Sequence, residues 1–137
     1  MSGSITRRGV LSGAAAIAGV SALPAFLAPA SAARSAIGHV VIDDRLARSA
    51  AFADGFVGAN IHHVDALDDL CNRWYTRLRR EVLADARHIA GLTTWMDYVV
   101  MRGCVSEIGY RELSSATTAA TSSDHVRRVT WVFAPRN

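Results

Sequence analysis

Residues 37–44 read Ile-Gly-His-Val-Val-Ile-Asp-Asp, and this stretch decides how the rest of the chain is interpreted. Its apolar residues are β-branched, and two aspartates close the run. Short apolar runs of this kind, bounded by turn-forming residues, are typical of buried strands. The stretch therefore predicts a strand over Ile37–Ile42.

Helical and strand patterns alternate along the chain after this strand. The first half predicts a helix over 46–57, a strand over 61–64, a helix over 66–86 and a weak strand over 88–92. A helix follows that begins at the Thr94 cap and stops at Gly109. After it we expect a strand over 110–113, a surface loop over 114–124 and a strand over 129–133. Successive parallel strands need a crossover helix, so this order predicts an α/β fold. We expect a mostly parallel sheet of four or five strands, flanked by about three helices. The last strand follows a loop and is expected to be an antiparallel edge.

Length and composition fit one folded domain preceded by a targeting segment. The 137 residues are 50% hydrophobic, with 10 Gly and 3 Pro, which excludes a disordered or collagen-like chain. Residues 1–32 are predicted to be a signal peptide, and residues 33–137 to be the single α/β domain.

The predicted signal peptide has three parts. The basic start contains Arg7 and Arg8, an uncharged segment runs from Val10 to Ala28, and Ala30-Ser31-Ala32 supplies the small residues that a signal peptidase needs. The segment Thr6-Arg7-Arg8-Gly9-Val10-Leu11-Ser12 resembles a twin-arginine (Tat) signal. It implies passage through the Tat translocase, cleavage before Ala33 and a periplasmic or secreted protein without a stable membrane span. The alternative is a retained anchor, because about 19 uncharged residues are nearly long enough to cross a bilayer.

The charge of the chain argues against a nucleic-acid partner. All 15 basic residues are arginines, and the formal net charge is +3. Loss of Arg7 and Arg8 with the signal peptide lowers that charge to +1. A nearly neutral, exported domain lacks the basic surface that phosphate binding requires.

Two resemblances concern the domain itself. A strand ending in Asp43-Asp44, then a helix and a second strand, resembles the opening of a response-regulator receiver domain. The expected third strand ends in Gly91-Leu92-Thr93 without an aspartate and the chain has no lysine, so the receiver chemistry is not implied. The Tat leader together with Ile89-Ala90-Gly91-Leu92-Thr93 and an apolar helix ending at Gly109 is similar to small uncharacterised Tat-exported bacterial α/β proteins. That resemblance implies the fold and the export route, and no activity.

Polar residues at the predicted strand ends are the candidate ligand site. In an open α/β sheet the ligand crevice lies outside the carboxyl ends of the strands. The expected ligand-binding residues there are Asp43, Asp44, Asp65, Thr93 and Thr94, and Arg45 directly follows the two aspartates at the same strand end. The helix start at Thr94 offers free N–H groups that suit a small anion. The alternative is that Asp65 and Thr94 only cap helices.

Histidines and cysteines give no strong motif. His62 and His63 are adjacent in a predicted strand, so they point to opposite faces and cannot both bind one ion. We therefore expect no metal and no cofactor, although a site assembled in space from separate histidines remains open. Cys71 and Cys104 either form a disulfide in an oxidising compartment or remain two buried thiols.

Two functions follow from these observations. The chain has no G-x-S-x-G, H-E-x-x-H, phosphate-loop or C-x-x-C motif, so no catalytic residue can be assigned. The first expectation is an exported binding or accessory protein that takes a small anionic ligand or a periplasmic partner protein. The alternative is a small periplasmic enzyme that uses Asp43 or Asp44 as acid or base, with an anion site at Thr93-Thr94.

Overall fold

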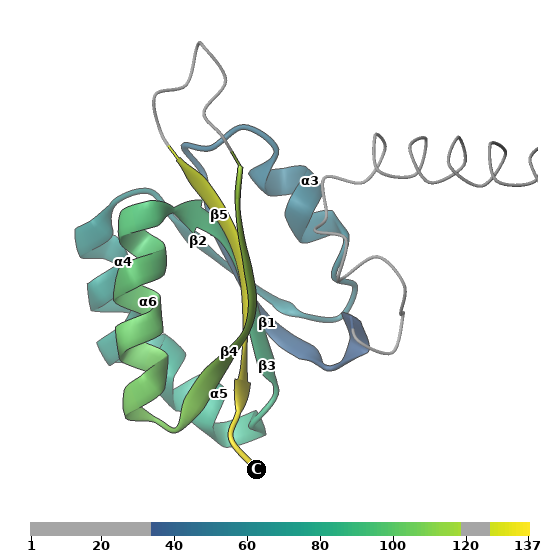
Figure 1. The fold of residues 1–137 in the computed structure, drawn as a ribbon, viewed down its shortest axis with the longest axis vertical. Helices are drawn as coiled ribbons and strands as arrows, with labels where there is room; N and C mark the ends of the chain where they lie inside the picture. The colour runs from purple at the N-terminus through teal and green to yellow at the C-terminus, as the bar shows by residue number, and fades with distance from the viewer. Residues whose placement is uncertain (1–33, 119–126) are drawn as a thin grey trace, which may run out of the picture.

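Five strands form one sheet in the computed structural model, which describes residues 34–118 and 127–137 (Figure 1). They are β1 (Ile37–Asp43), β2 (Asn60–Val64), β3 (His88–Thr94), β4 (Tyr110–Thr118) and β5 (Arg128–Pro135). Their order across the sheet is β2-β1-β3-β5-β4. The predicted alternation of strands and helices, with two strands at the end, is confirmed. The predicted signal peptide lies outside the described residues.

The sheet is mixed, so the prediction of a mostly parallel sheet is wrong. Strand β1 pairs in parallel with β2 and β3, whereas β5 pairs antiparallel with both β3 and β4, and these antiparallel ladders are the longer ones. No helix separates β4 from β5 in the described residues, and consecutive strands without a crossover helix pair antiparallel. The last strand, β5, is antiparallel as expected, but it lies between β3 and β4, so the edge strands are β2 and β4.

The loop predicted over 114–124 is wrong in its first part. Strand β4 continues to Thr118, and its backbone pairs with β5 from Ser114, opposite Val132, to Thr118, opposite Arg128. Most side chains of this stretch are exposed. An edge strand needs no continuous apolar face, which explains why apolar periodicity gave no signal for it. The remainder of the predicted loop, 119–124, lies outside the described residues.

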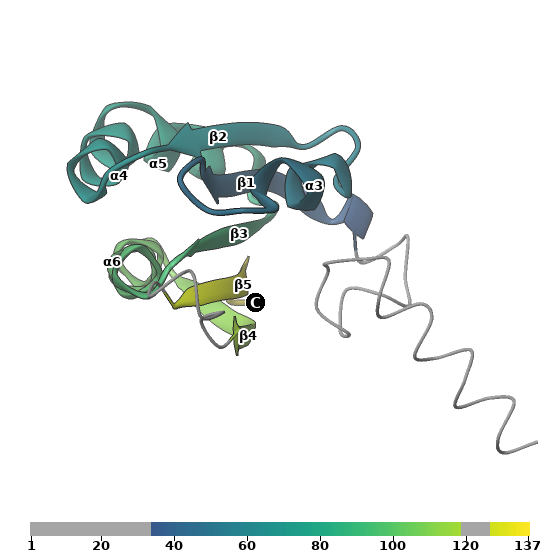
Figure 2. The ribbon, with the colours of Figure 1, turned by 90° about the horizontal axis from the view of Figure 1, so that it is seen from above.

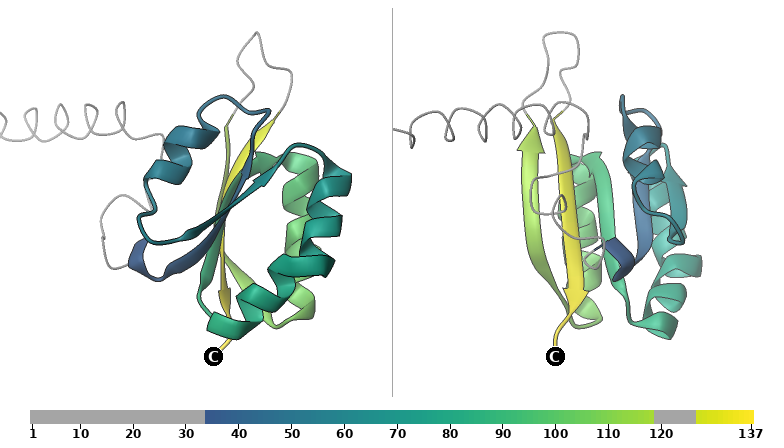
Figure 3. Two further views of the ribbon diagram at one scale, coloured as in Figure 1. Left: turned by 180° about the vertical axis from the view of Figure 1, so that it is seen from behind. Right: turned by 90° about the vertical axis from the view of Figure 1, so that its right-hand side faces the viewer.

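Helices cover both faces of the sheet (Figure 2). The helix α3 (Ser49–Asp54) lies on one face, while α4 (Leu67–Arg73), α5 (Arg79–Asp85) and α6 (Trp95–Glu107) lie on the other (Figure 3). Helix α3 is shorter than the predicted 46–57. The chain first makes turns closed by Leu46 and Ser49 N–H groups, and Arg48 adopts a left-handed conformation with φ 70°. None of the described helices has the length and apolar character that a membrane span requires.

A π-helical turn, η1 (Trp74–Leu78), joins α4 to α5, so the three segments together form the long helix predicted over 66–86. The buried residues of this long helix are spaced four residues apart: Leu70, Trp74, Leu78 and Val82. An α-helix has 3.6 residues per turn, so a row of such steps would drift around its surface. The wider π turn offsets that drift and keeps the whole row against the sheet.

Two apolar layers, one on each face of the sheet, make up the core. The layer under α4, α5 and α6 contains Trp74, Trp131 and Phe133, and the layer under α3 contains Phe52 and Phe56. Trp131 lies across from Gly91 on β3, and the indole covers the space where a Cβ of residue 91 would stand. The indole N–H donates to Thr93 Oγ1 at 2.9 Å. Gly91 is therefore required by the close approach of a buried aromatic ring.

Both cysteines are free thiols in this structure. Cys71 is partly buried on α4, and Cys104 is buried on α6. Burial raises the pKa of Cys104 to about 11. A thiol with that pKa is almost entirely protonated near neutral pH and is a poor nucleophile.

Candidate functional site

The carboxyl end of β1 holds a buried carboxylate. Asp43, the last residue of the strand, is fully buried. The backbone N–H and Nε of Arg45 donate to its Oδ1, each at 2.9 Å, and Arg45 Nη2 donates to its Oδ2 at 2.5 Å. Burial raises the pKa of Asp43, but the hydrogen bonds and charge of Arg45 outweigh burial and leave this pKa below its ordinary value. Asp43 is therefore ionised near neutral pH.

A second buried carboxyl group, Asp97, lies beside this pair. Asp97 belongs to the first turn of α6 and is 1% exposed. Its Oδ2 is 3.5 Å from Arg45 Nη2, and its Oδ1 is buried without a hydrogen-bond partner among the described residues. Burial raises the pKa of Asp97 to about 6, and the hydrogen bond and negative charge of Asp43 add to this rise. Two adjacent carboxyl groups thus have pKa values shifted in opposite directions.

We call Asp43, Arg45 and Asp97 the strand-end site. Local sequence explains how Arg45 and Asp97 reach it. Arg45 stands two residues after Asp43, and its N–H closes a turn onto the aspartate side chain, which brings the guanidinium back over the strand end. Thr94 caps α6, because its Oγ1 accepts from the Asp97 N–H at 3.2 Å. The cap fixes the start of the helix beside β1 and β3 and so places Asp97.

Three of the five residues expected at the strand ends lie at or near this site. Asp43 is its centre, and Thr94 caps the helix beside it. The hydrogen bond to Asp43 raises the pKa of Arg45, and the charges of Asp43, Asp97 and, least of all, Asp65 add to this rise. The Thr93 hydroxyl instead accepts from Trp131 and donates to the Thr94 carbonyl. Asp44 is exposed and pairs with His63 Nδ1 at 2.9 Å.

Asp97 was not among the residues predicted for the site, and Arg45 was expected at the strand end but not as a ligand-binding residue. The sequence shows Asp97 only as the third residue after a helix cap, where an acidic side chain needs no further role. Arg45 is one of several arginines in the chain. The available signal was the spacing Asp43-Asp44-Arg45, since an aspartate that ends a strand commonly accepts the N–H two residues later.

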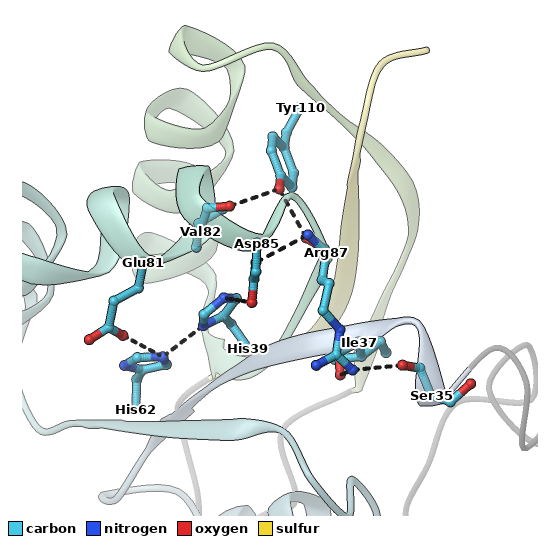
Figure 4. Close-up of polar contacts among 9 residues, drawn as sticks. All are labelled: Ser35, Ile37, His39, His62, Glu81, Val82, Asp85, Arg87 and Tyr110. Atoms are coloured by element: carbon cyan, nitrogen blue, oxygen red, sulfur yellow. Dashed lines mark hydrogen bonds and ion pairs between the residues drawn. The ribbon is translucent and has the colours of Figure 1, made fainter.

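The histidines of β2 behave as the strand pattern predicts. His62 is buried and faces α5, whereas His63 is exposed on the other side. His62 meets His39 of β1 there, where Glu81 and Asp85 of α5 also approach (Figure 4). The two histidines are 23 residues apart in the chain, so the spacing of histidines in the sequence did not predict this cluster.

Similarity to known proteins adds nothing to this geometry. The chain matches no protein-family model, and no curated protein and no solved structure is significantly similar to it.

Proposed function

We propose that this protein binds a small ligand that donates hydrogen bonds, such as a primary amine, at the strand-end site. The observation that supports this proposal is Asp97 Oδ1, a buried acceptor without a donor among the described residues. An unpaired buried polar atom of this kind costs about 1–3 kcal/mol, and native structures contain few of them. A ligand N–H group that reached this oxygen would remove the cost.

The charges around the site favour an amine over the small anion expected from sequence. Asp43 and Asp97 are buried there, and Asp65 lies close to Arg45. Arg45 is the cation that contacts the two buried carboxyl groups, and its side chain is 49% exposed. An ammonium group would meet carboxylate oxygens, while a phosphate or carboxylate would be repelled by them. The exposed guanidinium marks the side from which a ligand can approach.

We expect ethanolamine to raise the Tm of the protein and choline to leave it unchanged. The two molecules share a skeleton and a charge, but choline has no N–H donor, so the pair separates hydrogen bonding from charge attraction. The measurement is a thermal-shift titration at pH 7.5, repeated with phosphate and acetate. Asp97→Asn should abolish the amine effect, and Asp44→Asn, at an exposed neighbouring position, should preserve it. An amine effect that persists in Asp97→Asn would refute this role of the site.

A second candidate function is acid–base catalysis at the same site. The pKa of Asp97, near 6, suits a group that donates a proton, and the depressed pKa of Asp43 suits an ionised partner. Ligand recovery distinguishes the two functions. A stabilising amine that remains chemically unchanged after long incubation supports binding, whereas its consumption, slowed in Asp97→Asn, supports an enzyme.

We also propose that the protein is exported through the Tat translocase to the periplasm or beyond. Arg7 and Arg8, the uncharged segment after them and Ala30-Ser31-Ala32 support this location. In a bacterial host, we expect the exported chain to begin at Ala33, as N-terminal sequencing would show. Replacing Arg7 and Arg8 by lysine should leave the protein in the cytoplasm. An exported chain that begins at Met1 would contradict cleavage, and a second protein that co-purifies with the domain would favour the accessory role.

A further inference from the structure

We infer that His39, His62 and Glu81 form a binding site for a divalent first-row transition metal, zinc above all. This metal site is separate from the strand-end site. His39 and Asp43 share one face of β1 with Val41 between them, and four residues of strand span about 13 Å. The inference does not depend on the function proposed for the strand-end site.

Two parallel strands and one helix bring the three side chains together (Figure 4). The register of β1 and β2 sets His62 opposite Val41, so His39 lies diagonally across from His62 on the same face. Both imidazoles are almost fully buried. Glu81 extends from α5 above them, and its side chain is 28% exposed. An ion can therefore reach two buried histidines from the side of α5.

The distances between the ligand atoms suit a tetrahedral ion. His39 Nδ1 lies 3.3 Å from His62 Nε2, and His62 Nε2 lies 3.8 Å from Glu81 Oε2. All three ligand atoms lie within 4.8 Å of one another. Zinc binds histidine nitrogen at about 2.0–2.1 Å, which places tetrahedral ligand atoms roughly 3.3–3.4 Å apart. Two histidines and one glutamate make a known zinc ligand set that leaves one position open to solvent.

The outer contacts of the cluster are those that metal ligands need. Asp85 Oδ2 lies 2.8 Å from His39 Nε2, the ring nitrogen that faces away from His62. A carboxylate on the distal nitrogen of a histidine fixes the ring and leaves the other nitrogen free to bind metal. Arg77 donates to Glu81 Oε1 at 2.6 Å, so Oε1 is engaged and Oε2 is turned toward His62.

The charge state of the cluster also suits a cation. Burial, helped by the neighbouring His39, lowers the pKa of His62 to about 4, so this imidazole is neutral near pH 7 and can offer a lone pair. The nearby Arg73 and Arg77 each pair with a carboxylate four residues away along the helix, Asp69 and Glu81 respectively. Their positive charge is therefore partly offset.

A hydrogen-bonded chain without metal is the competing explanation. Asp85, His39 and His62 would then form a relay of two hydrogen bonds, which accounts for the 2.8 Å and 3.3 Å distances. It does not account for Glu81, because 3.8 Å from Glu81 Oε2 to His62 Nε2 is too long for a hydrogen bond. A shared ion accounts for the position of all three groups, and the titration below separates it from the hydrogen-bonded chain.

The test is titration of the EDTA-treated full chain with Zn²⁺, followed by calorimetry, and with Co²⁺, followed by visible absorption. We expect one equivalent of Zn²⁺ to bind and raise the Tm, and Co²⁺ to give the intense spectrum of a tetrahedral site. His62→Gln should lose this binding. Asp85→Asn should weaken it by about 10–100-fold, the usual effect of removing an outer carboxylate. His63→Gln, the adjacent exposed histidine, is the matched control and should bind like the wild type.

Circular dichroism of each variant shows whether it has folded, and Glu81→Gln removes a partly exposed ligand with little disturbance of the core. The inference is overturned if the wild-type chain binds no Zn²⁺ stoichiometrically. It is also overturned if folded His62→Gln and Glu81→Gln retain full affinity, since the metal would then be held elsewhere in the chain.

Discussion

Gly91→Ala should destabilise the protein by about 3 kcal/mol or more, the upper range for overpacking a core. A Cβ at position 91 would overlap the six-membered ring of the Trp131 indole. That ring is fully buried, and its N–H is held by Thr93 Oγ1, so it cannot move aside without losing packing and a hydrogen bond. Urea denaturation monitored by circular dichroism measures the change in the free energy of unfolding.

Gly103→Ala is the matched control for this substitution. Gly103 lies in α6, and no atom stands within 4 Å of the place its Cβ would occupy. Alanine there should stabilise the protein by about 0.5–1 kcal/mol through helix propensity. The double variant Gly91→Ala with Trp131→Leu should be destabilised by less than the sum of the two single substitutions, because leucine leaves room for the Cβ of residue 91. Wild-type stability of Gly91→Ala would show that the indole does not occupy this position.

The second large effect is expected from Asp97→Asn, which should stabilise the protein near pH 7. The pKa of Asp97 is about 6 in the folded protein, above its ordinary value of 3.8. The folded state therefore holds this proton more tightly than the unfolded chain, and stability falls as the pH rises from about 4 through 6. Two pKa units set an upper limit of about 3 kcal/mol, and we expect about 1–2 kcal/mol because Arg45 stabilises part of the charge.

The pH dependence of unfolding checks this prediction. The difference in stability between Asp97→Asn and the wild type should be small at pH 4 and reach its full size above pH 6. Asp44→Asn, at an exposed position, should stay within about 0.5 kcal/mol of the wild type at every pH. A destabilised Asp97→Asn at pH 7 would mean that the carboxylate is needed for folding. If Asp97→Asn is more stable than the wild type and no longer binds amines, the ionised Asp97 carboxylate lowers the stability of the fold but is needed for binding.

Local patterns in the sequence predicted the helices and strands better than they predicted which strands pair in the sheet. The β-branched run of β1, the long helix and the Thr94 cap are all strong local signals, and the structure contains all three. The position of β5 between β3 and β4 depends on contacts between segments far apart in the chain, which no local pattern reports. The same applies to the second half of β4, whose Ser and Thr side chains face solvent.

The sequence predicted only those site residues whose position follows from the secondary structure of their own segment. Asp43 follows from the rule that ligands gather at the carboxyl ends of strands. Asp97 has a complete local explanation as part of a helix start, so its second role became visible only when β1 and α6 were placed side by side. His39 and His62 come together through the parallel register of β1 and β2, and that register is not encoded in the spacing of histidines.

The interior position of β5 has a consequence for how the protein is made. This strand is the last of the described strands in sequence but lies inside the sheet, between β3 and β4. In a ribosome-bound chain that has not yet released residues 128–135, one edge of β3 would be unpaired, and β4 would lack the one described strand with which it pairs. The sheet can therefore be completed only after Pro135 has left the ribosome, so the core that β5 shares with β3 and β4 is among the last parts of this domain to form.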